Sequence, residues 1–188
     1  MRRFIARTTK TDHESQRPNP PETGRDLGQN NMPITPFHFG PGASLKAIGG
    51  KHFSFLIFCG SQVLMDIETG IRILVRSQQL HAFSNTYLGA VFIGGIAALI
   101  GKPITNAFLR LFAPKQAPVT WVASVSAAFM GTISHVILDS IMHPDAEPWA
   151  PFFAGNELLG IIRLDYLHLG CVLLGVIGGV VVVLRLKT

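Results

Sequence analysis

YLHLGCVLLGVIGGVVVVL, residues 166–184, contains no Asp, Glu, Lys or Arg. Two other stretches, residues 82–101 and 116–138, share this property. About 20 apolar residues in a helix are enough to cross the ~30 Å hydrocarbon core of a bilayer. We therefore expect each of these three stretches to form a transmembrane helix.

The composition of the whole chain also indicates a membrane protein. Only 14 % of the 188 residues are charged, against roughly 25 % in ordinary soluble domains, which argues against a soluble globular protein. The two cysteines, Cys59 and Cys171, lie in apolar stretches and indicate neither a disulfide framework nor a thiolate metal site. No basic face with interleaved aromatic residues is present, so we expect no nucleic-acid partner.

Three further stretches are less regular. Residues 53–75 have the length of a span, but Asp66, Glu68 and Arg72 interrupt them, and an acid at bilayer depth costs ~3 kcal/mol. Residues 33–51 are apolar but rich in Gly and Pro, as is typical of a re-entrant or interfacial segment, and residues 103–114 favour a short interfacial helix. We predict an all-α, polytopic membrane bundle of about four transmembrane helices plus this N-terminal segment.

Residues 1–31 differ from the rest because they are charged, Pro-rich and almost without apolar side chains. Such a segment buries too little surface to offset its chain entropy, so we expect a disordered extension. Alternatively, Met32 is the true start of the protein. Residues 32–188 form one transmembrane domain in either case.

The basic residues predict the orientation. They are concentrated before residue 53, between 102 and 115, and after 184, whereas the other loops contain only Arg72, Arg76 and Arg163. By the positive-inside rule, we expect both termini to lie in the cytoplasm and the spans to contact membrane lipids.

Several ionisable side chains lie toward the non-cytoplasmic ends of the expected spans. His135 and Asp139 are four residues apart and therefore share a helix face, which His143 extends if the helix continues. His81 and Asn85 repeat this spacing at the start of another span. A His–Asp pair that only packs inside the bundle is the alternative interpretation.

A metal site explains this clustering better. Acids and imidazoles that three helices place at a similar depth are destabilising if they stay unpaired, and a divalent cation removes this conflict. Both side-chain types are natural Zn²⁺ or Mn²⁺ ligands. Asp66 and Glu68 both lie in the interrupted span, residues 53–75. On a regular helix, residues two positions apart point in different directions, so Glu68 would point away from Asp66. Both can serve one site only if the helix is unwound near Gly70.

Several motifs also resemble a known family. They are MPITPFH (32–38), DIE (66–68), His81 and SHVILD (134–139), and together they resemble the LexA-regulated, inner-membrane-associated metal-dependent hydrolases of bacteria. The resemblance implies a similarity to zinc phospholipase C sites and these candidate ligands: His38, Asp66, Glu68, His81, His135 and Asp139. The chain departs from the family pattern at Ala82, where Arg is usual, and at Asn85 or Thr86, where a second His is usual.

These observations lead to one functional hypothesis. We expect a membrane hydrolase that cleaves an ester or phosphoester, of an amphiphilic substrate, with Asp66 or Glu68 as the general base. The candidate metal ligands are His38, Asp66, His81, His135, Asp139 and His143. His38 reaches such a site only if residues 37–50 dip into the bundle. A small ion or proton transporter and a catalytically decayed membrane scaffold are the alternatives.

Overall fold

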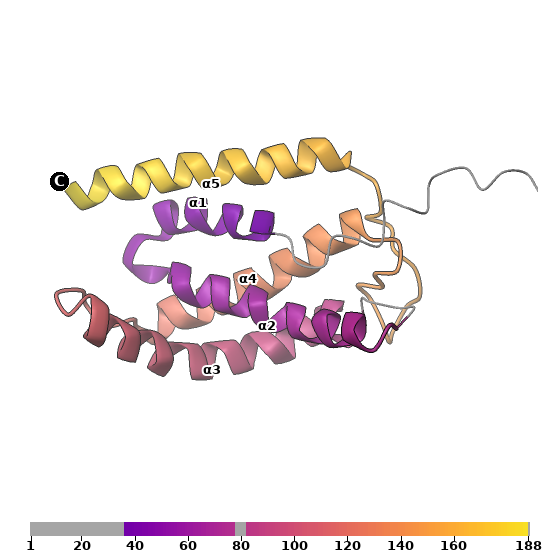
Figure 1. Cartoon of the computed structure of the whole chain (residues 1–188), viewed down its shortest axis with the longest axis horizontal. Helices are drawn as coiled ribbons and strands as arrows, with labels where there is room; N and C mark the ends of the chain where they lie inside the picture. The colour runs from indigo at the N-terminus through magenta and orange to yellow at the C-terminus, as the bar shows by residue number, and fades with distance from the viewer. Residues whose placement is uncertain (1–35, 78–81, 188) are drawn as a thin grey trace, which may run out of the picture. The chain divides into compact units, whose positions relative to one another are not determined.

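The computed structural model describes residues 36–77 and 82–187, and all the regular structure in those ranges is helical. Its α-helices are α1 (Phe39–Gly49), α2 (Phe55–Leu74), α3 (Tyr87–Phe112), α4 (Trp121–Met142) and α5 (Leu164–Lys187) (Figure 1). Short 3₁₀ turns precede the first three: η1 (Pro36–His38), η2 (Gly50–His52) and η3 (Phe83–Asn85). The predicted all-α bundle is therefore confirmed. The expected extension, residues 1–31, lies outside the described residues, as does His81.

Three of the described helices, α3, α4 and α5, are long and apolar enough to cross a membrane. The helix α2 has 20 residues and thus sufficient length, but its charged residues Asp66, Glu68 and Arg72 set it apart from these three. With 11 residues, α1 is too short to span a bilayer. The structure thus agrees with the expectation of full spans accompanied by a shorter N-terminal segment.

Hydroxyl side chains define where the long helices begin. Thr86 Oγ1 accepts a hydrogen bond of 2.9 Å from the Gly89 N–H at the start of α3, and Thr120 Oγ1 accepts one of 3.2 Å from the Ala123 N–H at the start of α4. Ser54 caps α2 in the same way. Each cap satisfies an N–H group that has no partner inside the helix.

One expected boundary is wrong. Residues 103–114 do not form a separate interfacial helix, because α3 continues through Pro103 to Phe112. Membrane helices tolerate an internal proline when neighbouring groups satisfy the backbone that it frees. The distal part of α3 is also anchored by its neighbours: Asn106 Oδ1 accepts a 2.7 Å hydrogen bond from the Val119 N–H, and Lys102 lies 4.7 Å from the Trp121 ring centre.

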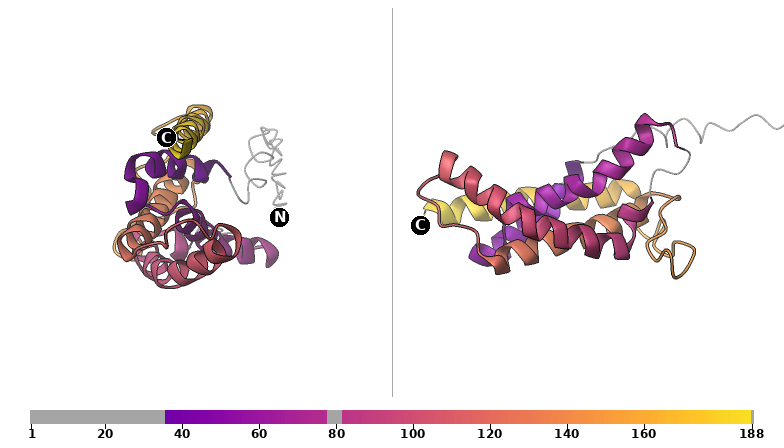
Figure 2. Two further views of the ribbon diagram at one scale, coloured as in Figure 1. Left: turned by 90° about the vertical axis from the view of Figure 1, so that its left-hand side faces the viewer. Right: turned by 90° about the horizontal axis from the view of Figure 1, so that it is seen from below.

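Small residues allow the helices to pack closely. The helix α5 runs along α1, and α2 lies against both α3 and α4 (Figure 2). A Cβ atom on Gly178 of α5 would lie 2.2 Å from the Ser44 backbone nitrogen of α1, and one on Gly131 of α4 would lie 2.0 Å from Ser61 Oγ of α2. Glycine at these positions is therefore required for the observed contacts.

The packing brings η1, η3 and parts of the long helices together. The turn η3 contacts α2, α3 and α4, while η1 contacts α4 and α5. Figure 1 shows α2 and α4 side by side in the bundle. These segments contain the polar side chains described next.

Candidate metal centre

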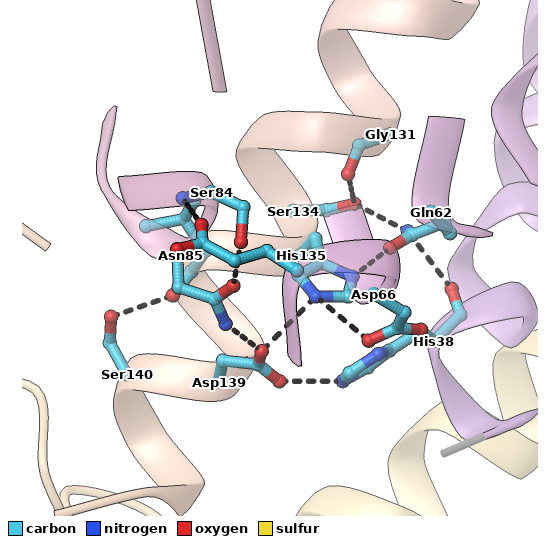
Figure 3. Close-up of polar contacts among 12 residues, drawn as sticks. His38, Gln62, Asp66, Ser84, Asn85, Gly131, Ser134, His135, Asp139 and Ser140 are labelled. Atoms are coloured by element: carbon cyan, nitrogen blue, oxygen red, sulfur yellow. Dashed lines mark hydrogen bonds and ion pairs between the residues drawn. The ribbon is translucent and has the colours of Figure 1, made fainter. Parts of the chain in front are cut away.

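His38, His135 and Asp139 form a buried group, called here the ligand group. His38 comes from η1, and His135 and Asp139 come from successive turns of α4 (Figure 3). One potential ligand atom from each residue lies within 4.8 Å of those of the other two, and all three residues are buried. The i, i+4 spacing on α4 places the pair on one face, as the sequence predicts. The contribution of η1 depends on the close pairing of α1 with α5.

The nitrogen and oxygen atoms of the group approach one another at regular distances. His135 Nε2 lies 3.1 Å from Asp139 Oδ2, and His38 Nε2 lies 3.3 Å from Asp139 Oδ1. Asp66 of α2 joins this arrangement, with its Oδ1 3.5 Å from His135 Nε2 (Figure 3). Ligand atoms bound tetrahedrally at about 2.0–2.1 Å from a zinc ion are separated by about 3.3 Å. The three residues of the ligand group are therefore close enough to share one cation, with Asp66 beside them.

Gln62 determines which nitrogen of His135 is available. Gln62 Nε2 donates one hydrogen bond to the His38 carbonyl oxygen at 3.4 Å and one to Ser134 Oγ at 3.2 Å. Because a carbonyl oxygen can only accept, the atom of Gln62 that faces it is the NH₂ nitrogen. This orientation directs Gln62 Oε1 at His135 Nδ1, 2.7 Å away, so Nδ1 carries the proton. The Nε2 lone pair then faces Asp139 and Asp66. Metal-bound histidines are usually held in this way by a hydrogen bond at their second nitrogen.

The imidazole nitrogens of the ligand group are buried. His135 Nε2 and His38 Nε2 have Asp139 oxygens as neighbours at 3.1 and 3.3 Å, and among the described residues His38 Nδ1 has no hydrogen-bond partner. Buried polar atoms without a partner are uncommon and costly. A cation between these nitrogens and the carboxylates would satisfy them.

The environment of His38 favours the neutral ring that metal binding needs. Burial lowers the pKa of His38 to about 4, although the nearby Asp139 acts in the opposite direction. A neutral imidazole can donate a nitrogen lone pair to a cation, whereas an imidazolium cannot.

Asn85 holds Asp139, the carboxylate of the ligand group, through a hydrogen bond. Its Nδ2 donates a hydrogen bond to Asp139 Oδ2, and its Oδ1 accepts one of 3.0 Å from Ser84 Oγ. Both residues belong to η3 and are buried. Asn85 thus contacts the ligand group through a hydrogen bond to one of its members.

The other sequence-predicted residues are placed differently. His81 lies outside the described residues, so its proposed role stays a prediction. Because α4 ends at Met142, His143 has extended backbone angles and does not continue the helical stripe, and it is not part of the ligand group. Since α2 is continuous through Gly70, Glu68 points away from Asp66.

Glu68 has different partners. Its Oε1 lies 2.9 Å from Arg72 NH2, and its Oε2 accepts a 2.7 Å hydrogen bond from the Ser84 N–H. These contacts connect α2 to η3. The role of Gln62, in contrast, was not predicted, although its position four residues before Asp66 on the same helix face is visible in the sequence.

This chain has no match among protein-family models, curated proteins or solved structures.

Proposed function

We propose that the protein is a membrane-embedded, metal-dependent hydrolase that cleaves an ester or phosphoester bond. The observation that carries the proposal is the buried ligand group, whose three side chains come from two separate segments and approach within 4.8 Å. Hydrolytic zinc sites typically use three protein ligands and leave a further position for water or substrate, whereas structural zinc sites use four protein ligands.

The donor atoms support Zn²⁺ or Mn²⁺ as the ion. The group offers imidazole nitrogens and a carboxylate and includes no thiolate, a set that suits these two ions. Asp139 and the neighbouring Asp66 together balance the charge of a divalent cation. Such a cation supplies a Lewis acid that polarises a carbonyl or phosphoryl oxygen and acidifies water.

Asp66 is proposed as the general base. Its carboxylate lies next to the ligand group, and its side chain is 15 % exposed, whereas those of Asp139 and His135 are 5 % and 0 % exposed. It therefore lies on the more open side of the site, where a water molecule can enter. There it accepts the proton of the attacking water. Glu68 is less suited to this role because its side chain points away from Asp66, toward Arg72 and Ser84.

The membrane setting supports an amphiphilic substrate. Two of the three residues of the ligand group lie on α4, one of the helices able to span a bilayer, so a substrate that partitions into lipid can approach the site. The distribution of Lys and Arg supports an orientation with both chain ends in the cytoplasm, and the resemblance supports a bacterial inner membrane. The motifs that resemble the inner-membrane hydrolases include His38, Asp66, His135 and Asp139.

Metal analysis of the full chain, purified in mild detergent, tests the proposal. We expect about one divalent ion per wild-type chain and almost none in His135→Ala, because His135 Nε2 lies within 3.5 Å of the carboxylates of both Asp139 and Asp66. His52→Ala, which changes an exposed histidine in η2, serves as the control and retains the ion. A wild-type protein without divalent metal, or a His135→Ala variant with the full amount, would refute the metal centre.

Hydrolysis is tested separately with p-nitrophenyl ester and phosphodiester probes. Asp66→Asn keeps the ion but lowers the rate by about 10²–10⁴, the usual contribution of a positioned general base. A metal-loaded wild type that is inactive on both probe classes contradicts hydrolysis while leaving the metal centre intact.

A further inference from the structure

A second feature of the molecule lies outside the metal centre. A groove of about 540 Å³ runs between α2 and α3, called here the α2–α3 groove. Its walls include Leu64, Ile67 and Ile71 of α2 and Phe92 and Ile93 of α3. This volume falls within the range of about 300–1,000 Å³ that is usual for small-molecule sites.

The groove and the metal centre use different faces of α2. Gln62 and Asp66 lie on the face that meets His135 of α4, whereas Ile67 and Ile71 lie on the face that meets α3. The groove is therefore a separate site and its occupant does not need to be hydrolysed.

The walls of the groove include exposed apolar side chains from both helices. Phe92 belongs to α3, a helix able to span the membrane, and is 62 % exposed. Across the groove, Ile67 and Ile71 are 50 % and 55 % exposed. Such a run of exposed apolar side chains is stable in contact with lipid but not with water. The occupant that enters from this side is therefore apolar along most of its length.

The polar groups of the groove have a different character. Glu68 and Arg72 pair at 2.9 Å, and Ser84, whose N–H donates to Glu68, lies beside them. A carboxylate and a guanidinium side by side complement the ammonium and the phosphate of a zwitterionic headgroup. Apolar walls combined with one charged pair match an amphiphile better than they match a helix of another protein.

We propose that the α2–α3 groove binds an acyl chain of a zwitterionic membrane phospholipid, whose headgroup lies against Glu68 and Arg72. The site is also connected to the metal centre by hydrogen bonds. Ser84 donates to Asn85, and Asn85 donates to Asp139. Ser84 of the groove is thus linked through Asn85 to a residue of the ligand group.

Photolabelling tests the lipid site without reference to hydrolysis. The detergent-solubilised full chain is titrated with a phosphatidylethanolamine that has a diazirine in one acyl chain, and the labelled peptides are mapped. We expect saturable labelling on peptides that contain Ile67, Ile71 or Phe92, competed by unlabelled phosphatidylethanolamine. Labelling that rises without saturation, or that maps to α5 alone, would overturn the proposal, as would crosslinking of the groove to a second copy of the chain.

Matched variants make the test specific. Ile67→Trp fills the groove and lowers the apparent affinity about tenfold, the effect expected when roughly two methylene contacts are lost. Val63→Trp is the control. Val63 lies one turn before Ile67 on α2 and is 52 % exposed, but it does not line the groove, so we expect this variant to be labelled like the wild type. Ile71→Trp is a second groove-filling variant if the first does not fold. Equal labelling of the groove-filling and control variants would contradict the lipid site, whatever the metal analysis shows.

Discussion

At the scale of single residues, the chemistry of the site depends on a neutral amide. Gln62 holds Nδ1 of His135 through its carbonyl oxygen, and this contact directs Nε2 toward Asp139 and Asp66. The amide is itself oriented by the His38 carbonyl oxygen, so a ligand from η1 and a ligand from α4 share one support.

Replacing Gln62 therefore weakens metal binding although it is not a ligand. Gln62→Leu removes the acceptor at Nδ1, and we expect the affinity for Zn²⁺ to fall about 10–100-fold, as is usual when such a supporting partner is lost. Gln62→Glu retains an acceptor and binds at least ten times more tightly than Gln62→Leu. Competition with a chromogenic chelator measures both. Wild-type affinity in Gln62→Leu would show that the contact has no role in binding.

At the scale of helices, close packing is restricted to particular glycines. The pairs Gly94–Gly95 and Gly178–Gly179 look alike in the sequence, yet only the first member of each faces a neighbour. A Cβ atom on Gly94 would lie 3.0 Å from Thr132 Oγ1, whereas one on Gly95 or Gly179 would meet nothing within 4 Å. Adjacent residues of a helix point about 100° apart because the helix has 3.6 residues per turn. The second glycine of each pair therefore faces a different direction from the first.

The pairing of α1 with α5 can be tested at these positions. Gly178→Ala introduces a methyl group 2.2 Å from the Ser44 backbone nitrogen, and we expect it to destabilise the protein by about 1–3 kcal/mol, as is typical of overpacking. Gly179→Ala faces open space and should be neutral or slightly stabilising, because alanine favours helix. Thermal unfolding in detergent, followed by circular dichroism, compares the two. Equal stability of both variants would contradict the close α1–α5 contact.

At the scale of the whole molecule, the metal centre joins segments that are distant in the sequence. Its side chains come from η1, α2 and α4, and Asn85 of η3 adds a further connection. An ion bound there stabilises only the folded arrangement, since the unfolded chain does not hold these residues together.

Metal removal should therefore lower the stability of the fold. With free Zn²⁺ at about 100 times its dissociation constant, the ion contributes about 2.7 kcal/mol to the free energy of unfolding. We expect a chelator to lower the midpoint of thermal unfolding of the wild type and to leave that of His135→Ala unchanged. An equal decrease in both proteins would show that the chelator acts elsewhere.

Part of this architecture could be predicted from sequence because it depends on local properties. The absence of charge over residues 82–101, 116–138 and 166–184 predicts membrane helices from solvation alone, and the spacing of His135 and Asp139 predicts a shared face from helix geometry. Residues 103–114 were predicted wrongly because a proline breaks a helix in isolation, whereas in α3 its neighbours support the continuous helix.

The amino-acid sequence by itself determined that this chain forms apolar helices and that one of them presents an imidazole and a carboxylate on the same face. Only the tertiary structure decided that His38 joins this pair, that Gln62 orients it, and that Glu68 is directed to Arg72 and Ser84. The physical reason is that helix periodicity fixes directions only within one helix. Which residues of different helices meet depends on packing, here on the glycines that let α1 approach α5 and α2 approach α4.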